Sequence, residues 1–252
     1  MAFGLIASTK KNWLMAFFTA LAVMIAAASG LQSESAACRS SFVSALDAGV
    51  STERALRDLA GDIEAGRERE IILSVVKSFR TGLPEAEEEA LVTIVQQESL
   101  FYGYDPILIL SIIKVESTFY NWSKSPAGAM GLMQIRPFVG KAMAREADIE
   151  WEGPQTLYDP VSNVRIGTYY LSKLLLQFQD LRTALAAYNR GPTAVRSLMR
   201  EGERVPLFYA SRIITTYGDL KKEHCGIEWV EAGLSDHRPA DSAQSLYNRV
   251  SI

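Results

Sequence analysis

The chain has 252 residues, of which 48% are apolar and 22% are charged, and its formal net charge is −3. This length fits one or two domains of ordinary globular composition. The small negative charge argues against the basic surface that nucleic-acid binding requires, so we expect no nucleic-acid partner.

The first 30 residues predict export. Two lysines, Lys10 and Lys11, precede an apolar run over residues 13–28 in which Thr19 is polar. A basic start, an apolar centre and small residues after it are typical of a secretory signal. The run is shorter than the ~20 residues that span a bilayer. Counted to Gly30 it reaches 18 residues, so a cleaved signal and a retained membrane anchor over residues 13–30 both stay open.

The chain has two cysteines, Cys38 and Cys225. In an oxidising compartment the two thiols can pair, so a disulfide between them is a hypothesis. The segment before Cys38 is a poor acylation site, because Ser35 stands where an aliphatic residue is usual. His224 lies beside Cys225, which is not a metal-site spacing. We interpret His224 and His237 as surface residues of a tail and predict neither metal nor cofactor.

Residues 39–103 predict several amphipathic helices, and no sustained strand pattern or internal repeat interrupts them. One helix is expected over residues 51–66, where Ser51 is a capping residue, and another over residues 69–80. A third covers residues 83–101, where Pro84 and the acids at 85–89 suit a helix start. We interpret these acids as a solvated first turn. Glu98, near the end of this helix, is expected to be solvated or to cap the helix.

The next helix ends in a second glutamate, Glu116. Asp105 is a plausible N-cap, Pro106 suits the first helical position, and the residues up to Val115 are almost all apolar. Such a helix is buried. Burial and the negative end of the helix dipole both raise the pKa of a carboxyl group there, as a general acid requires. From this helix alone, a buried glutamate satisfied by local hydrogen bonds is an equal interpretation.

Four segments, the end of this helix and three later ones, decide between these interpretations. After a "VES" segment at 115–117 come "SPAGAMGLMQIRP" at 125–137, "DPVSNVRIGTYYL" at 159–171 and "AYNRGP" at 187–192. In this order and spacing they resemble the soluble-lytic-transglycosylase-like catalytic domain, over roughly residues 92–217. The resemblance implies an all-α, goose-type lysozyme-like fold with an N-terminal helical extension. It selects Glu116 rather than Glu98 as the catalytic residue.

The resemblance also implies a domain organisation. We expect a signal or anchor at 1–30, a helical N-terminal region at 31–91, a catalytic domain at 92–220 and a C-terminal tail at 221–252. The N-terminal helical region would pack on the catalytic domain or dock a protein partner of the envelope. The protein would then lie in the periplasm or envelope of a bacterium.

The implied reaction is cleavage of the β-1,4 bond between N-acetylmuramic acid and N-acetylglucosamine in peptidoglycan, with a 1,6-anhydromuramoyl product. Glu116 would act first as acid and then as base. Glycosidases that use water need two carboxyl groups, and the carboxylate-free run over residues 117–145 fits a scheme with one. A hydrolytic muramidase and a non-catalytic glycan-binding module of an envelope assembly are the alternatives.

The resemblance assigns substrate-binding roles to five further residues. Ser125 and Gln134 would bind acetamido groups or orient Glu116, and the backbone at Met133 would line the groove. Tyr188 would place its hydroxyl near Glu116, and Asn189 would bind sugar or brace the turn. The alternative for these polar side chains is that they satisfy loop backbone or pack in the core.

Three departures from the family pattern affect these expectations. Arg136 stands where the family often has a methionine against the substrate, and Arg190 replaces the small residue usual after the Tyr-Asn pair. Before "YASRII" at 209–214, relatives often have an acidic Glu-Thr-Arg-like piece, where this chain has "VPLF" at 205–208. A supporting glutamate is therefore expected to be missing.

Overall fold

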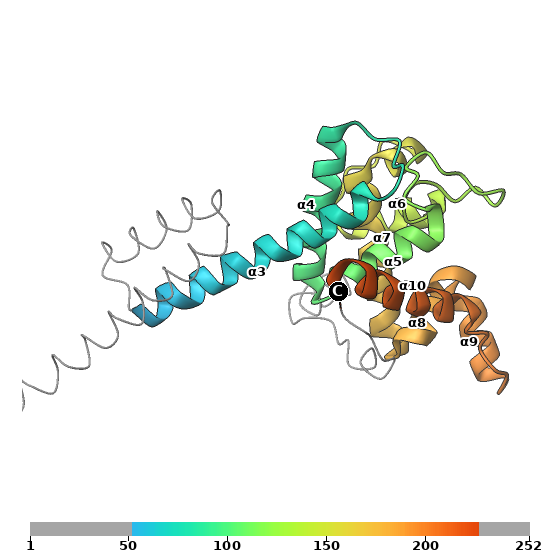
Figure 1. Cartoon of the computed structure of the whole chain (residues 1–252). Coiled ribbons are helices and arrows are strands. Elements are labelled where there is room, and N and C mark those ends of the chain that lie inside the picture. The colour runs from blue at the N-terminus through green and yellow to red at the C-terminus, as the bar shows by residue number, and fades with distance from the viewer. Residues whose placement is uncertain (1–51, 227–252) are drawn as a thin grey trace, which may run out of the picture. The chain divides into compact units, whose positions relative to one another are not determined.

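The computed structural model describes residues 52–226, and the regular elements in this part are helices (Figure 1). The all-α class expected from the sequence is confirmed there. The elements are α3 (Thr52–Lys77), α4 (Glu85–Tyr102), α5 (Pro106–Ser117), α6 (Pro137–Glu146), the 3₁₀ helix η1 (Pro154–Tyr158), α7 (Pro160–Phe178), α8 (Leu181–Arg190), α9 (Pro192–Arg200) and α10 (Phe208–Cys225).

Several sequence predictions fall outside the described residues. These are the signal or anchor, the acylation and pairing of Cys38, the cap at Ser51, His237 and the tail beyond Gly226. Among residues 52–226, no helix combines the length and the apolar character that crossing a bilayer requires.

The chain divides into two compact units, Met1–Gly66 and Arg67–Ile252. The described part of the first unit is helical, and Leu56 and Ile63 are exposed on it. The second unit contains the core, which includes Ile72 from the α3 segment as well as α4–α10. This compact unit begins at Arg67 and its helix α10 continues to Cys225, while the expected bounds of the catalytic domain, 92–220, stay a prediction.

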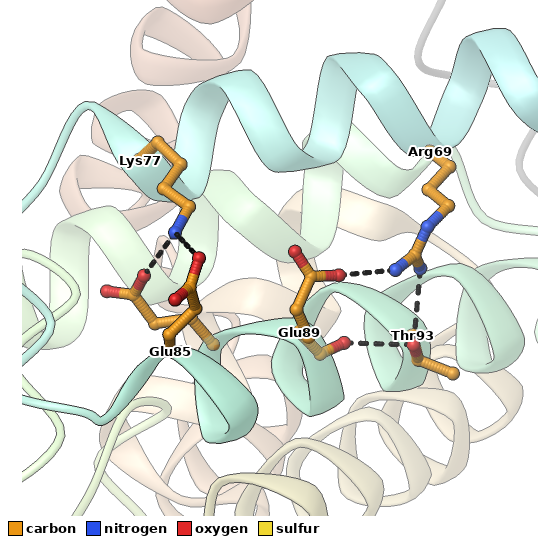
Figure 2. A network of polar contacts seen from close by, with 6 residues as sticks. Arg69, Lys77, Glu85, Glu89 and Thr93 are labelled. Atoms are coloured by element: carbon orange, nitrogen blue, oxygen red, sulfur yellow. Dashed lines mark hydrogen bonds and ion pairs between the residues drawn. The ribbon is translucent and has the colours of Figure 1, made fainter. Parts of the chain in front are cut away.

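The second half of α3 is fixed to α4 by burial and by charge. Val75 and Val76 are fully buried, and apolar burial of this kind supplies most of the stabilisation. Arg69 pairs with Glu89 at 2.5 Å (Figure 2), and Lys77 pairs with Glu88 at 3.0 Å. Partly exposed pairs add little energy, so we infer that they mainly set the register between the helices.

Two details of this region differ from the sequence prediction. The helices expected at 51–66 and 69–80 are one helix that runs on through Gly66. A helical glycine costs only about 1 kcal/mol, which the packing of residues 67–77 outweighs. The solvated acidic turn is also wrong in part, because Glu88 and Glu89 are half-buried partners of α3.

Helix α5 is buried as predicted. The Asp105 side chain accepts a hydrogen bond from the Ile107 amide, Pro106 occupies the first turn, and residues 106–113 are buried. The helix ends where Thr118 adopts a left-handed conformation at φ 53°. Its sides pack against α4 and α10. Glu116 therefore lies in the last turn of a buried helix that packs beside α10.

Helix α7 supports the other side of the site. Asp159 caps it by accepting from the Ser162 amide, and it packs against α4, α6 and α8. Gly167 allows close approach here, since a Cβ at this position would lie 2.4 Å from Met133 Sδ. The loop over residues 125–137, called the glycine-rich loop below, therefore packs directly on α7.

Candidate active site

Glu116 is a half-buried carboxyl group in the last turn of α5. Its Oε1 accepts a hydrogen bond from the Tyr209 hydroxyl at 2.6 Å. Burial raises the pKa of Glu116, and the Tyr209 hydrogen bond and the positive charge of Arg212 oppose that rise in part. The net direction is upward, which is the direction that a general acid needs near neutral pH.

Tyr209 contacts Glu116, and the sequence reasoning did not single it out. It lies in the first turn of α10, which packs against α5. Burial, and then the charge of Glu116, raise the pKa of Tyr209 well above its ordinary value. The phenol therefore remains a hydrogen-bond donor. Its signal in the sequence was the tyrosine that opens "YASRII", directly after the "VPLF" departure.

Tyr188 lies near Glu116, but its hydroxyl bonds elsewhere. It donates to the carbonyl oxygen of Met133 at 3.0 Å, and its ring packs against Tyr170 at 5.3 Å between centroids. Burial and the nearby charge of Glu116 raise the pKa of Tyr188 well above its ordinary value. In this structure Tyr188 supports the glycine-rich loop, and Tyr209 makes the hydrogen bond to the acid that we expected of Tyr188.

Met133 is fully buried, and both of its backbone polar groups are engaged by side chains. Its amide donates to Asn163 Oδ1 at 2.8 Å, and its carbonyl accepts from Tyr188. Met133 is therefore the buried anchor of the loop, and the expectation that its backbone lines a groove stays a prediction.

Asn163 is a second residue that the prediction did not single out. It is fully buried in α7, and its side-chain amide donates to the carbonyls of Met130 at 3.1 Å and Leu157 at 2.8 Å. Gly131 is required beside it, because a Cβ there would lie 2.1 Å from the Leu157 oxygen. Two hydrogen bonds of Asn163 thus hold the loop on α7, and the third holds η1.

Gln134 and Ser125 both stabilise the loop itself. Gln134 adopts a left-handed conformation at φ 49°, and its amide nitrogen donates to the carbonyls of Ser123 and Gly131 at 3.1 and 2.9 Å. The Ser125 hydroxyl accepts from the Ala129 amide at 3.0 Å. The alternative interpretation, in which these side chains satisfy loop backbone, therefore describes part of what both do.

The end of α8 presents Asn189 to solvent. Asn189 is exposed, and the chain turns directly after it at Gly191, where φ is 89°. Within residues 52–226, the Asn189 side chain makes no hydrogen bond or ion pair. Of the five expected binding residues, it is the one whose polar group is wholly available to a ligand.

Glu98 is neither solvated nor a helix cap, which corrects the expectation for it. Its side chain is 13% exposed, lies 3.7 Å from Arg165, and accepts from the Thr168 hydroxyl at 2.9 Å. Burial raises the pKa of Glu98, while Thr168 and Arg165 oppose the rise. A raised pKa therefore does not distinguish Glu98 from Glu116; the tyrosine donor and the adjoining loop do.

Both arginines that depart from the family pattern lie on the surface. Arg136 is exposed, with its guanidinium 5.1 Å from the centre of the Phe138 ring. Arg190 is exposed, and Val205, in the "VPLF" segment, packs against the core. Within residues 52–226, no three His, Cys, Asp or Glu side chains gather as a metal site would require.

Residues 93–205 match the family model described as "Transglycosylase SLT domain". The chain is 41% identical over 90 residues to the soluble lytic murein transglycosylase of Salmonella typhimurium, covering 35% of this chain and 14% of that one. It is 36% identical to the membrane-bound lytic murein transglycosylase E of Buchnera aphidicola, covering 49% and 58%. The solved 70 kDa soluble lytic transglycosylase of Escherichia coli is 27% identical, with a TM-score of 0.48, covering 54% and 24%. The chain thus spans only about a seventh of the length of the Salmonella relative.

Proposed function

We propose that this protein, whose residues 93–205 form a transglycosylase SLT domain, is an exported peptidoglycan lytic transglycosylase. The observation that carries the proposal is the half-buried Glu116, hydrogen-bonded to Tyr209 at 2.6 Å at the end of α5. The relatives named lytic murein transglycosylases support the substrate class. Residues 1–30 would direct export to the cell envelope.

Glu116 would transfer one proton in each direction. The protonated carboxyl gives its proton to the glycosidic oxygen, and the bond from that oxygen to the muramoyl anomeric carbon breaks. The acetamido carbonyl oxygen of the same sugar attacks the anomeric carbon and holds its positive charge. The Glu116 carboxylate then takes the proton of the 6-hydroxyl. That oxygen displaces the acetamido oxygen and closes the 1,6-anhydro ring.

A single acid suffices for this sequence of steps. Two-carboxylate glycosidases place their acids about 5–9.5 Å apart, and a neighbouring carboxylate at such a distance would raise the pKa of the acid. Within residues 52–226, the groups that shift the pKa of Glu116 are Tyr209 and Arg212, together with burial. This surrounding favours the intramolecular 6-hydroxyl over a base-activated water.

The remaining residues would position the sugar around this acid. Asn189 would bind a sugar hydroxyl from the end of α8. Gln134 would offer its amide oxygen, since its nitrogen is held by the loop, and Ser125 would offer its hydroxyl hydrogen. Tyr188 and Met133 would hold the glycine-rich loop in position through their hydrogen bond. Tyr209 would keep the Glu116 carboxyl aimed and stabilise its ionised form.

Mass spectrometry of muropeptides released from purified sacculi tests the proposal. We expect anhydromuramoyl products from the wild type, and a loss of at least about 100-fold in Glu116→Gln, the scale of general-acid catalysis. Glu98→Gln is the matched control and should retain most activity. Reducing muramoyl ends would instead identify a muramidase. Retention on sacculi without release of sugar would identify a binding module.

A further inference from the structure

A second concave site lies between α4, α6 and α7, with a volume of about 330 Å³. Neither Glu116 nor Tyr209 lines it, so it is separate from the candidate active site. The side chains that decide its chemistry are Glu98 and Phe101 from α4, Glu146 at the end of α6, Asp148 in the turn after it, and Arg165 and Tyr169 from α7.

The charges around this pocket are predominantly negative. Glu146 pairs with Lys173 and accepts from the Tyr169 hydroxyl at 3.3 Å, and Glu98 pairs loosely with Arg165. Asp148 is exposed and makes no ion pair within residues 52–226. Three carboxylates therefore face two cations. Helices α4 and α6 also end at the pocket, and helix C-termini carry partial negative charge.

Glu98 offers an acceptor at the inner wall. Its Oε2 accepts from Thr168, but its Oε1 lies 3.7 Å from Arg165 Nε and makes no hydrogen bond within the described residues. A carboxylate that is 13% exposed and half satisfied favours a donor that can reach it. A ligand ammonium is such a donor, and hydrogen bonds between two charged groups are the strong ones.

The walls suit an organic cation. Phe101 is 37% exposed and meets Tyr102 edge to face at 4.9 Å, so its ring is held in place. Tyr169 and Ile149 add further apolar surface to the lining. Aromatic faces attract ammonium groups, and the apolar walls bury an attached aliphatic chain. The carboxylates of Glu98, Glu146 and Asp148 would repel an anionic ligand.

We propose that this pocket binds a primary ammonium group on a short aliphatic chain, with Glu98 and Asp148 as its anionic partners. Two sources share this chemistry: an amino side chain of a peptide attached to the glycan, and a free diamine. The peptide source rests on the proposed function, whereas the site itself does not.

The test uses the full chain carrying Glu116→Gln and the probe 1,5-diaminopentane, followed by calorimetry and by the amide signals of Phe101 and Tyr102. Saturable binding is expected, with none for 1,5-pentanediol, which has the same length without charge. Adding Glu98→Gln should weaken binding roughly tenfold, as expected for one lost charge-assisted contact. Glutamine keeps the size of Glu98 and can still accept from Thr168.

Two further variants keep the result interpretable. Asp148→Asn changes an exposed residue and should also weaken binding, even if Glu98→Gln melts early. Glu150→Gln alters an exposed acid outside the lining and should leave binding unchanged. Absence of saturable binding, or equal losses in Asp148→Asn and Glu150→Gln, would overturn the proposal.

Sacculi distinguish the two sources. Acetylation of their amino groups should reduce retention of the Glu116→Gln protein, and adding Glu98→Gln should remove that difference. If acetylation changes nothing while diaminopentane binds, the natural ligand is a free amine. Muropeptide release by the wild-type chain is measured separately, so failure of the amine site and failure of the proposed activity are distinct results.

Discussion

The hydrogen bond from Tyr209 to Glu116 should tune the pKa of the acid, and Tyr209→Phe removes it with little other change. Tyr209 is 7% exposed, and phenylalanine fills the same space. The hydroxyl stabilises the ionised carboxylate, so its loss should raise the pKa of Glu116 beyond the rise that burial already causes.

The size of this shift follows from the contact. A hydrogen bond to a charged group contributes about 1.5–3 kcal/mol, and one pKa unit corresponds to about 1.4 kcal/mol. Glu116 is only half-buried, so water replaces part of the lost interaction. We therefore expect the lower end of the range, an upward shift of about one unit.

Initial rates of muropeptide release between acid and alkaline pH measure this shift. The acid must be protonated to start the reaction, so the rate falls as the pH rises through the pKa of Glu116. In Tyr209→Phe this fall should move to higher pH by about one unit.

The control is Tyr217→Phe on the same helix, where the hydroxyl donates to Asp105 at 2.7 Å. This variant should lower the melting temperature and leave the pH profile in place. The reasoning would be refuted if the pH at which the rate falls were unchanged or lower in Tyr209→Phe. It would also be refuted if this pH rose by the same amount in Tyr217→Phe.

Three further predictions concern the loop and the cost of the acid. Gly131→Ala should abolish activity and lower the melting temperature sharply, because its Cβ would lie 2.1 Å from a carbonyl oxygen. The matched variant Gly128→Ala has a similar φ, and its Cβ would meet nothing within 4 Å. It should therefore lower the free energy of unfolding by only about 1 kcal/mol in chemical denaturation. Asn163→Leu should lower the free energy of unfolding by roughly 3–5 kcal/mol, because three buried backbone groups lose their partner; a smaller loss than in Gly128→Ala would contradict this. Glu116→Gln should raise the melting temperature relative to the wild type at pH 8 but not below pH 4.5. A carboxyl pKa above the ordinary 4.5 destabilises the fold only at pH values where the unfolded chain has released this proton. The same change in melting temperature at both pH values would contradict this prediction.

The parts of the fold that local sequence determines were predictable. Asp105 and Pro106 start α5, and the apolar residues after them bury it, because capping and periodicity depend on neighbours in the chain. The same logic located the start of α4 near Pro84. It failed at Gly66, because tertiary packing of the following residues carries α3 through a weak helix former.

The contacts of the candidate site depend on packing between distant segments. Tyr209 lies 93 residues from Glu116, so only the placement of α10 against α5 selects it over Tyr188. The burial of Glu98 likewise requires Thr168 and Arg165 from α7. Residue type and spacing pointed to Glu116, whose role as the acid stays a prediction. They did not show which hydroxyl reaches Glu116 or that a second glutamate is also buried.

In the proposed mechanism one carboxyl both gives and takes a proton, and the position of Glu116 between two helix ends suits that role. Burial and the C-terminal end of α5 disfavour its charge, whereas Tyr209, Arg212 and the N-terminal end of α10 favour it. An acid governed by burial alone would hold its proton too tightly to act as a base. One governed by donors alone would be ionised before the glycosidic oxygen needs the proton.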